Sequence, residues 1–351
     1  MVIVVYMALL AYVLQDNRAP EQYSLASLTE SARDEYARGR FVEAEALLTR
    51  ALETVPMQET QRARIVSDVA DIQVNLDELT KAEQNYRQAL AIYKRLQDDA
   101  GVAMMLRNLG ALYSLQGRDD DAREVLEKSL KLARKTRLDP VSIGRILNSF
   151  GVTYYRQGKI KEASKFFNEA FQTASAETLQ NRGDLLNNMG AVYHALREYG
   201  KAEDYLKQAL AITESIVGPE HPDTTLSLTP LGVLYIDMGK YAEAENQFLR
   251  ALRILNAHEP VLDTRVARLL HGLSIVYRRT DRQPEAEEAL ARAAILARRN
   301  ISRNPAMPLI LDEYAQALRK TGKNKEAEEL RGEIRRAKVE AGLVINAHSL
   351  F

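Results

Sequence analysis

Small and apolar residues recur along this chain with a long, regular period. A small residue (Ala, Gly or Ser) is followed twelve positions later by alanine in eight places, and successive places lie 38 to 42 residues apart. The eight pairs are Ala32/Ala44, Ala70/Ala82, Gly110/Ala122, Gly151/Ala163, Gly190/Ala202, Gly232/Ala244, Ser274/Ala286 and Ala315/Ala327. Because the internal spacing never varies, the pattern predicts an array of eight copies of one structural unit.

The positions around each pair have the spacing of helices. Leucine or valine lies four residues before every small residue, and in the five middle copies a tyrosine lies three residues after it: Tyr113, Tyr154, Tyr193, Tyr235 and Tyr277. Spacings of three, four and eight mark one face of a helix rather than a strand. In five copies glycine follows seven positions after the small residue, where a helix end needs a left-handed residue. Each copy is therefore predicted to be two helices joined by a short turn.

One such helix pair is too thin to bury its own apolar face, so the copies must stack. The predicted fold class is all-α, an α-solenoid of about eight helix-turn-helix repeats. The boundaries are expected near residues 24–56, 62–98, 103–136, 143–176, 182–217, 224–256, 266–300 and 307–341, with a tail at 342–351. Pro230 lies within the first helix of the sixth copy and should kink or delay it. Arg331, Arg335 and Arg336 replace apolar residues in the last copy and indicate that nothing stacks on it.

The residues that recur at equivalent positions of the eight copies, here called columns, resemble those of tetratricopeptide repeats. A leucine column replaces the usual tryptophan, and the copies are longer than the common 34 residues; both features resemble the kinesin-light-chain type. The linker GPEHPDT at 218–224 is a recurrent element of that type. The resemblance implies a right-handed superhelix whose first helices line a concave groove, and it implies use as a binding scaffold.

Composition and motifs exclude several classes of function. The 48 basic residues balance the 48 acidic ones, which disfavours a general nucleic-acid or anionic-membrane binder. No cysteine is present, so disulfides, thiolate metal sites and cysteine nucleophiles are excluded. The five histidines lack metal-ligand spacing, and no catalytic constellation or phosphate loop is found. The chain is predicted to be non-enzymatic, without cofactor or metal.

The concave face carries the candidate binding residues. Asparagine is a poor helix former, so its recurrence on first helices of three copies suggests hydrogen bonds to the backbone of an extended peptide, as the resemblance also implies. The alternative is that these side chains only cap helices or contact solvent. Basic residues occupy the C-terminal half of this face, which favours a partner with an acidic segment. The candidates are Arg107, Asn108, Asn148, Tyr155, Arg156, Asn187, Asn188, His194, Arg268, His271, Arg278, Arg279, Arg319 and Lys320.

Two functions fit this pattern. The first is a scaffold or adaptor that binds a peptide or partner protein in the groove. The second is a peptide-sensing regulatory solenoid that acts through a separate effector protein. The sequence leaves the partner and the oligomeric state open.

An apolar run, VIVVYMALLAYVL at residues 2–14, stands apart from the array. As a helix it would span about 20 Å, less than the ~30 Å hydrocarbon core of a bilayer. It fits the apolar part of an export signal or membrane anchor, or a helix that caps the first repeat. Localisation follows from that choice: exported or membrane-tethered in the first case, cytoplasmic in the second.

Overall fold

The computed structural model describes residues 24–173, 179–258, 263–301, 304 and 306–341. Sixteen α-helices and one short 3₁₀ helix account for most of these residues, and no strand occurs among them. The helices pair in chain order as α2 (Leu25–Ala37) with α3 (Phe41–Thr54), α4 (Glu59–Asn75) with α5 (Leu79–Arg95), α6 (Asp99–Leu115) with α7 (Asp119–Lys135), α8 (Pro140–Arg156) with α9 (Ile160–Thr173), α10 (Leu179–Ala195) with α11 (Tyr199–Val217), α12 (Thr225–Asp237) with α13 (Tyr241–Asn256), α14 (Asp263–Arg279) with α15 (Gln283–Arg299), and α16 (Met307–Lys320) with α17 (Asn324–Ala341).

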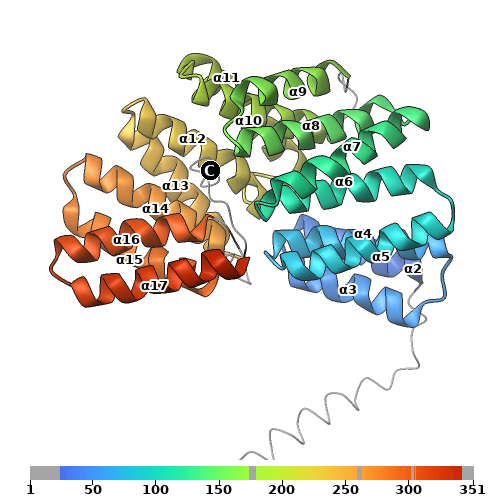
Figure 1. The fold of residues 1–351 in the computed structure, drawn as a ribbon, viewed down its shortest axis with the longest axis horizontal. Helices are drawn as coiled ribbons and strands as arrows, with labels where there is room; N and C mark the ends of the chain where they lie inside the picture. Colours follow the sequence, from blue (N-terminus) through green and yellow to red (C-terminus); the bar gives the residue numbers. More distant parts are fainter. Residues whose placement is uncertain (1–23, 174–178, 259–262, 302–303, 305, 342–351) are drawn as a thin grey trace, which may run out of the picture.

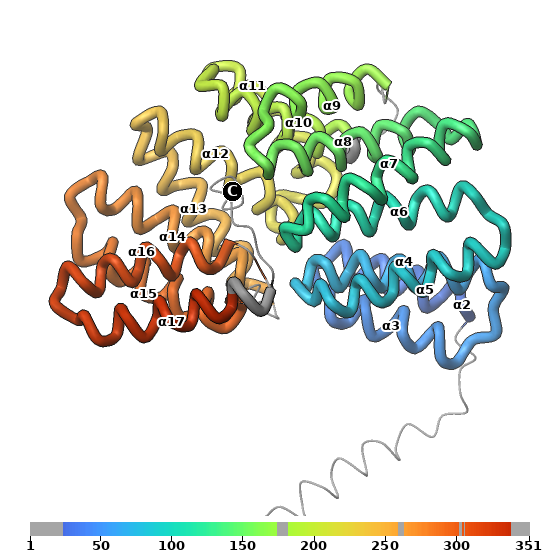
Figure 2. The backbone as a smooth tube through the Cα atoms, in the orientation of Figure 1, coloured from blue at the N-terminus to red at the C-terminus, as the bar shows by residue number. Residues whose placement is uncertain are grey.

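The eight pairs stack side by side into a curved array, as Figures 1 and 2 show. In Figure 1 the array rises from α2–α5 through the green helices at the top and descends to α14–α17. First helices of neighbouring pairs contact one another in several places, among them α6 with α8, α10 with α12 and α12 with α14. They form the inner layer of the array. The predicted all-α solenoid is confirmed.

The small-residue column lets the two helices of a pair approach closely. A Cβ added at Gly110, Gly151, Gly190 or Gly232 would lie 2.4–2.5 Å from the side chain of Leu126, Phe167, Leu206 or Phe248, respectively. Each of those large side chains follows the alanine of its own repeat by four residues and is fully buried. The invariant spacing of twelve thus reflects one contact between a small residue and a large one, repeated along the array.

The turn between the two helices of a repeat has a left-handed residue in every copy. Five copies use glycine at that position, and the other three use Asp77, Arg197 and Asp281 with φ of 57–61°. Glycine adopts this conformation without the steric penalty of a side chain. The backbone turn is therefore the same in all eight repeats, including those where the glycine signal is missing.

Neighbouring repeats are also joined by a repeated ion pair between the turn of one repeat and the outer helix of the repeat before it. Arg118 lies 3.1 Å from Glu83, Lys240 lies 3.0 Å from Glu203, and Arg282 lies 2.9 Å from Glu245. Each cation also lies over the column tyrosine of its own repeat, with Arg118 4.0 Å from the Tyr113 ring centroid. A cation that pairs with a carboxylate and a ring at once holds adjacent repeats in register.

Two local predictions concern Pro230 and the last repeat. Pro230 lies inside α12, which is preceded by the 3₁₀ helix η1 (Pro222–Thr224) and continues to Asp237. The helix therefore continues past the proline, and the predicted kink stays a prediction. Arg335 and Arg336 are exposed on α17, whereas Ile334 beside them is buried. The final helix accordingly faces solvent on that side.

Residues 2–14 and the tail at 342–351 lie outside the described residues. Within the described ranges, none of the helices is both long enough and apolar enough to cross a membrane.

A contact between distant repeats, here called the ring contact, closes the array on one side. It comprises Tyr36 and Asn75, at the ends of α2 and α4, together with His221, Asp223 and Arg265. The Tyr36 hydroxyl donates to Asp223 Oδ2 (3.2 Å) and accepts from Asn75 Nδ2 (3.0 Å). Arg265 donates to Asn75 Oδ1 (3.0 Å), and His221 Nε2 donates to the Tyr36 carbonyl (2.9 Å). Residues 185–190 positions apart thus hold the first two repeats against the sixth and seventh.

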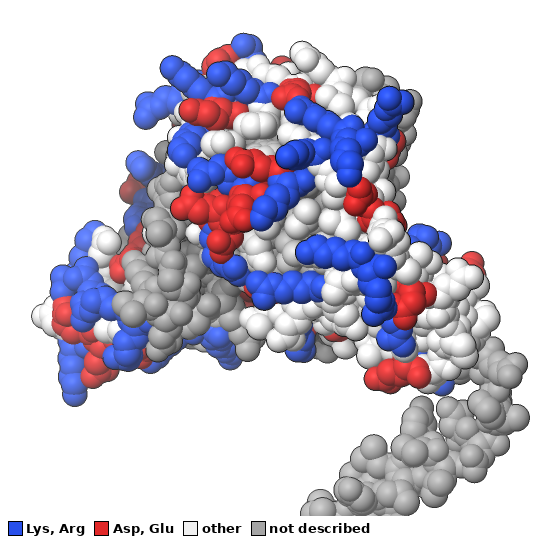
Figure 3. Space-filling model, turned by 45° about the vertical axis from the view of Figure 1, so that its right-hand side comes forward, with Lys and Arg blue, Asp and Glu red and all other residues white. Residues whose placement is uncertain are grey.

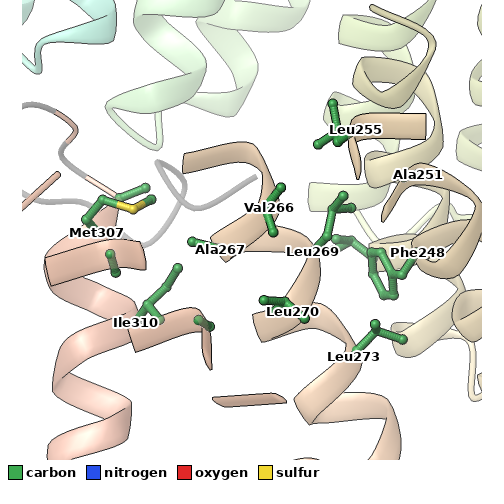
Figure 4. Close-up of a cluster of buried hydrophobic side chains, with 14 of the residues drawn as sticks. Phe248, Ala251, Leu255, Val266, Ala267, Leu269, Leu270, Leu273, Met307 and Ile310 are labelled. Atoms are coloured by element: carbon green, nitrogen blue, oxygen red, sulfur yellow. The ribbon is translucent and has the colours of Figure 1, made fainter. Parts of the chain in front are cut away.

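The largest hydrophobic cluster also joins the two ends of the array. It includes Phe41 and Leu48 from the first repeat together with residues of the last four repeats. Figure 4 shows part of it, with Phe248 of α13, Leu273 of α14 and Ile310 of α16 drawn as sticks.

Candidate peptide-binding site

A cavity of about 330 Å³ lies on the inner face of the array, between the first helices of the fourth to seventh repeats. Helices α8, α10, α12 and α14 supply most of its lining, and Phe167 and Leu206 from outer helices complete it. The inner-helix residues that line it are Asn148, Val152, Tyr155, Arg156, Asp184, Asn187, Asn188, Ala191, His194, Thr225, Leu226, Thr229, Pro230, Val233, Arg265 and Arg268. The walls are thus mixed, with apolar surfaces between amide and charged groups.

Half of the predicted binding residues line this cavity. They are Asn148, Tyr155, Arg156, Asn187, Asn188, His194 and Arg268. They come from three different helices, and the fold brings them to one site.

The other predicted residues lie elsewhere. Asn108 and His271 are each no more than 5% exposed and pack between first helices, where Asn108 donates to Ser67 Oγ (3.4 Å). Arg278 and Lys320 line a second cavity of about 410 Å³ between the last two repeats. The remaining three, Arg107, Arg279 and Arg319, line none of the cavities described here; Arg319 pairs with Glu328.

Two asparagines in the cavity form a pair that leaves hydrogen-bonding capacity unused. Asn188 Nδ2 donates to Asn148 Oδ1 at 2.7 Å. The amide nitrogen of Asn148, with two N–H groups, and the amide oxygen of Asn188 then have no partner among the described residues. A peptide group needs one acceptor for its N–H and one donor for its carbonyl. The pair can therefore bind a peptide backbone without regard to side chains. Asn187 is placed differently, because its Nδ2 donates to Ser227 Oγ (2.9 Å) within the packing.

The charged groups that line the cavity are largely shielded from water, which shifts their pKa values. Desolvation raises the pKa of Asp184 to about 6, although Arg145 and Arg107 act in the opposite direction. Desolvation, together with the like charges of Arg156 and Arg265, lowers the pKa of Arg268 to about 10. Desolvation also lowers the pKa of Arg156. The solvent-accessible lining of the cavity thus lies in a medium less polar than water, in which charges interact strongly.

The sequence patterns overlooked several lining residues, including Asp184 and Leu226. Both lie six positions before the small residue of their repeat, as Arg268 does. They would have been identified if the positions assigned to the concave face had been extended by one helical turn toward the start of each first helix. The walls supplied by outer helices, such as Phe167, carry no such signal, because their side chains belong to the packing column.

His271 belongs to a small charged cluster toward the C-terminal end of the inner layer. Glu313 Oε2 accepts from His271 Nε2 at 2.6 Å, and Glu313 Oε1 accepts from Arg278 at 2.5 Å. These hydrogen bonds and charges, His271 first, lower the pKa of Glu313 from 4.5 to about 2. The cluster ties the seventh repeat to the eighth.

This depressed pKa predicts an acid-sensitive contribution to stability. Because the folded pKa lies below the unfolded value, the contribution is present above pH 4.5 and is lost as the pH falls toward 2. Glu313→Gln should lower the free energy of unfolding at pH 7 by about 1.5–3 kcal/mol. The difference from the parent should shrink steadily between pH 4.5 and 2. Urea unfolding across this range measures it, with the exposed Glu288→Gln as control. A difference that stays constant with pH would contradict the assignment.

Charges of both signs are mixed on the surface away from the cavity. On the face shown in Figure 3, basic and acidic side chains lie side by side. On the outer helices, Lys128 pairs with Glu124 and Arg134 with Glu169. No group of three or more His, Asp or Glu side chains that could hold a metal ion occurs within the described ranges.

Comparison with known proteins agrees with this architecture. Two models of the tetratricopeptide repeat match the chain, one at residues 61–135 and 181–257 and the other at 144–180. The chain therefore belongs to the tetratricopeptide repeat family. Its relatives include kinesin-light-chain-related proteins, which agrees with the repeat type indicated by the sequence.

Individual relatives are distant and longer. Protein KINESIN LIGHT CHAIN-RELATED 2 of Arabidopsis thaliana is 28% identical over 265 residues, covering 70% of this chain and 37% of that protein. The human Cell division cycle protein 16 homolog is 27% identical over 175 residues, covering 48% of this chain and 26% of that protein. The chain thus spans well under half the length of either relative.

Among solved structures, a Rap protein complexed with competence and sporulation factor has a TM-score of 0.64 at 14% identity. The match covers 95% of this chain and 90% of that one. This similarity shows the fold, a helical solenoid.

Proposed function

We propose that this protein is a non-enzymatic scaffold that binds an extended peptide segment of a partner protein in the inner cavity. The observation that carries the proposal is the Asn148–Asn188 pair, which offers a free donor nitrogen and a free acceptor oxygen on the neighbouring helices α8 and α10. Val152, Leu226 and Val233 line the same cavity and supply apolar surface for side chains of the bound segment. A backbone-binding amide pair between apolar walls suits an extended chain better than a compact small molecule.

The relatives support the class of partner rather than its identity. That Rap protein is in complex with competence and sporulation factor, and its fold matches nearly the whole of this chain. At 14% identity no residue role is transferred from it. The proposal for this chain rests on its own cavity.

Asn148→Ala combined with Asn188→Ala tests the proposal. Each asparagine contributes one or two hydrogen bonds of about 0.5–1.5 kcal/mol net. The double variant should therefore bind the partner segment about tenfold to a hundredfold more weakly. The loss should depend little on salt, because no ionic charge is removed. The measurement is fluorescence anisotropy with a labelled segment of a partner retained by the full chain.

The matched control is Asn168→Ala, which removes an exposed asparagine from the outer helix α9. It should bind as the parent does. If the double variant also binds as tightly as the parent, with unchanged helical content, the inner cavity is not the peptide site.

A second function, a regulatory solenoid that responds to a peptide, is favoured by one specific observation. Arg265 lines the cavity and also belongs to the ring contact, where it donates to Asn75 and pairs with Asp223. A bound segment that engaged Arg265 would compete with the contact that closes the array. The occupied and empty states would then differ in shape, which is what a separate effector protein could recognise.

A further inference from the structure

Two arginines from repeats far apart in the sequence approach each other across the inner face. Arg156 is the last residue of α8, and Arg268 lies in the second turn of α14. Both line the same cavity, and the charge of Arg156 disfavours the charged form of Arg268. Like charges held this close inside a protein are unfavourable unless an anion lies between or beside them.

Protein groups only partly offset this positive charge. Arg268 Nε is buried without a hydrogen-bond partner, and no ion pair to Arg268 occurs within the described ranges. Among the described residues Arg156 donates to the Leu115 carbonyl at 3.4 Å, and Asp119 favours the charged form of Arg156. Asp77, in the turn before α5, favours the charged form of Arg268.

The two other charged groups nearby are engaged elsewhere. Arg265 is occupied by Asp223 and Asn75 in the ring contact. Asp184 lines the cavity too, and the cations that act on it are Arg145 and Arg107 rather than Arg156 and Arg268. Arg268 therefore brings a buried Nε without a hydrogen-bond partner to the same cavity wall as a second guanidinium.

We propose that Arg156 and Arg268 together bind a carboxylate group of the peptide that occupies the cavity. The inference rests on the proposed function and adds the chemistry that the bound segment must present. Guanidinium groups bind carboxylates through paired N–H donors, and such charge-assisted hydrogen bonds are stronger than neutral ones. A carboxylate placed here would also link α8 of the fourth repeat to α14 of the seventh.

The carboxylate can come from the C-terminus of a peptide or from an Asp or Glu side chain, and inorganic phosphate shares its chemistry. Four probes separate these sources: inorganic phosphate, acetyl-Ala-Gly-Ala-Gly with a free C-terminus, acetyl-Ala-Asp-Ala-Gly-amide, and the neutral acetyl-Ala-Gly-Ala-Gly-amide. The thermal midpoint of the full chain is followed by circular dichroism at constant ionic strength. We expect a saturable rise with phosphate and with at least one of the two acidic peptides, and none with the neutral peptide. Saturation with phosphate alone, or with none of the probes, overturns the proposal.

Substitution of the two arginines tests whether the probes bind at Arg156 and Arg268. Arg156→Gln and Arg268→Gln should each raise the apparent dissociation constant for the responsive probes about tenfold or more. Arg292→Gln, on the exposed face of α15, should leave it unchanged. The two positions lie in different repeats, so a folding defect in one variant leaves the other informative, and Arg268→Lys keeps the charge at that position. Parent-like responses in both glutamine variants would overturn the assignment.

Failure here can be told apart from failure of the proposed function. If the Asn148/Asn188 variant loses the partner segment while the arginine variants keep it, the cavity binds peptide without using these cations. If neither set affects binding, the cavity is not the site at all.

Discussion

Phe248→Ala should lower the free energy of unfolding by about 3–5 kcal/mol. The ring is 0% exposed and lies between two glycines of neighbouring first helices. A Cβ at Gly232 would lie 2.5 Å from the ring, and one at Gly272 would lie 2.7 Å from it. Removing the ring leaves a void that neither glycine can fill. Because most contacts join neighbouring repeats, hydrogen exchange should increase first in α12–α14.

The adjacent residue provides the matched control for that substitution. Leu249 lies on the same helix and is 45% exposed. Leu249→Ala should change the free energy of unfolding by no more than about 0.5 kcal/mol. Urea unfolding of both variants gives the comparison. Equal costs at the two positions would show that the column of small and large residues does not hold the array together.

Arg265→Met should open the ring contact. Arg265 is mostly buried, and its loss removes the hydrogen bond to Asn75 and the ion pair with Asp223. The expected cost is about 1.5–3 kcal/mol, the range for hydrogen bonds to charged groups. The first two repeats should then move away from the sixth and seventh, and the radius of gyration from small-angle X-ray scattering should increase.

Arg292→Met, on the exposed face of α15, serves as control for that experiment. It should change neither the free energy of unfolding nor the radius of gyration. An unchanged radius of gyration in Arg265→Met would mean that the apolar contacts of Phe41 and its neighbours close the array without the polar ring contact.

Most of the fold could be predicted because each repeat encodes its own geometry locally. The pairing of Gly151 with Phe167 or of Gly190 with Leu206 depends on residues at a fixed spacing within one copy. The turn also depends only on residues within one repeat, and it persists where Arg197 replaces the glycine. A pattern that recurs within every 40 residues or so is visible without knowledge of distant contacts.

The ring contact could not be predicted in the same way. It joins Tyr36 to Asp223 and Asn75 to Arg265, and whether these residues meet depends on small rotations between repeats that add up along the array. No single repeat contains that information.

The candidate site illustrates the same limit. Asn108 and Asn148 both belong to the asparagine pattern on first helices, yet Asn108 is buried beside Ser67 while Asn148 lines the cavity. Periodicity assigns a residue to a face of its helix. It does not tell how closely the next first helix covers that face.

Two equally exposed leucines of the sixth repeat allow the most direct test of the central claim. Leu226 on α12 is 47% exposed and lines the cavity, whereas Leu249 on the outer helix α13 is 45% exposed and lies outside it. A photo-reactive leucine analogue is introduced at one position or the other in the full chain, and the complex with a retained partner is irradiated. Cross-linking of the partner from position 226 and not from position 249 is the predicted result. Cross-linking from position 249 alone would place the binding surface on the outer helices and contradict the account.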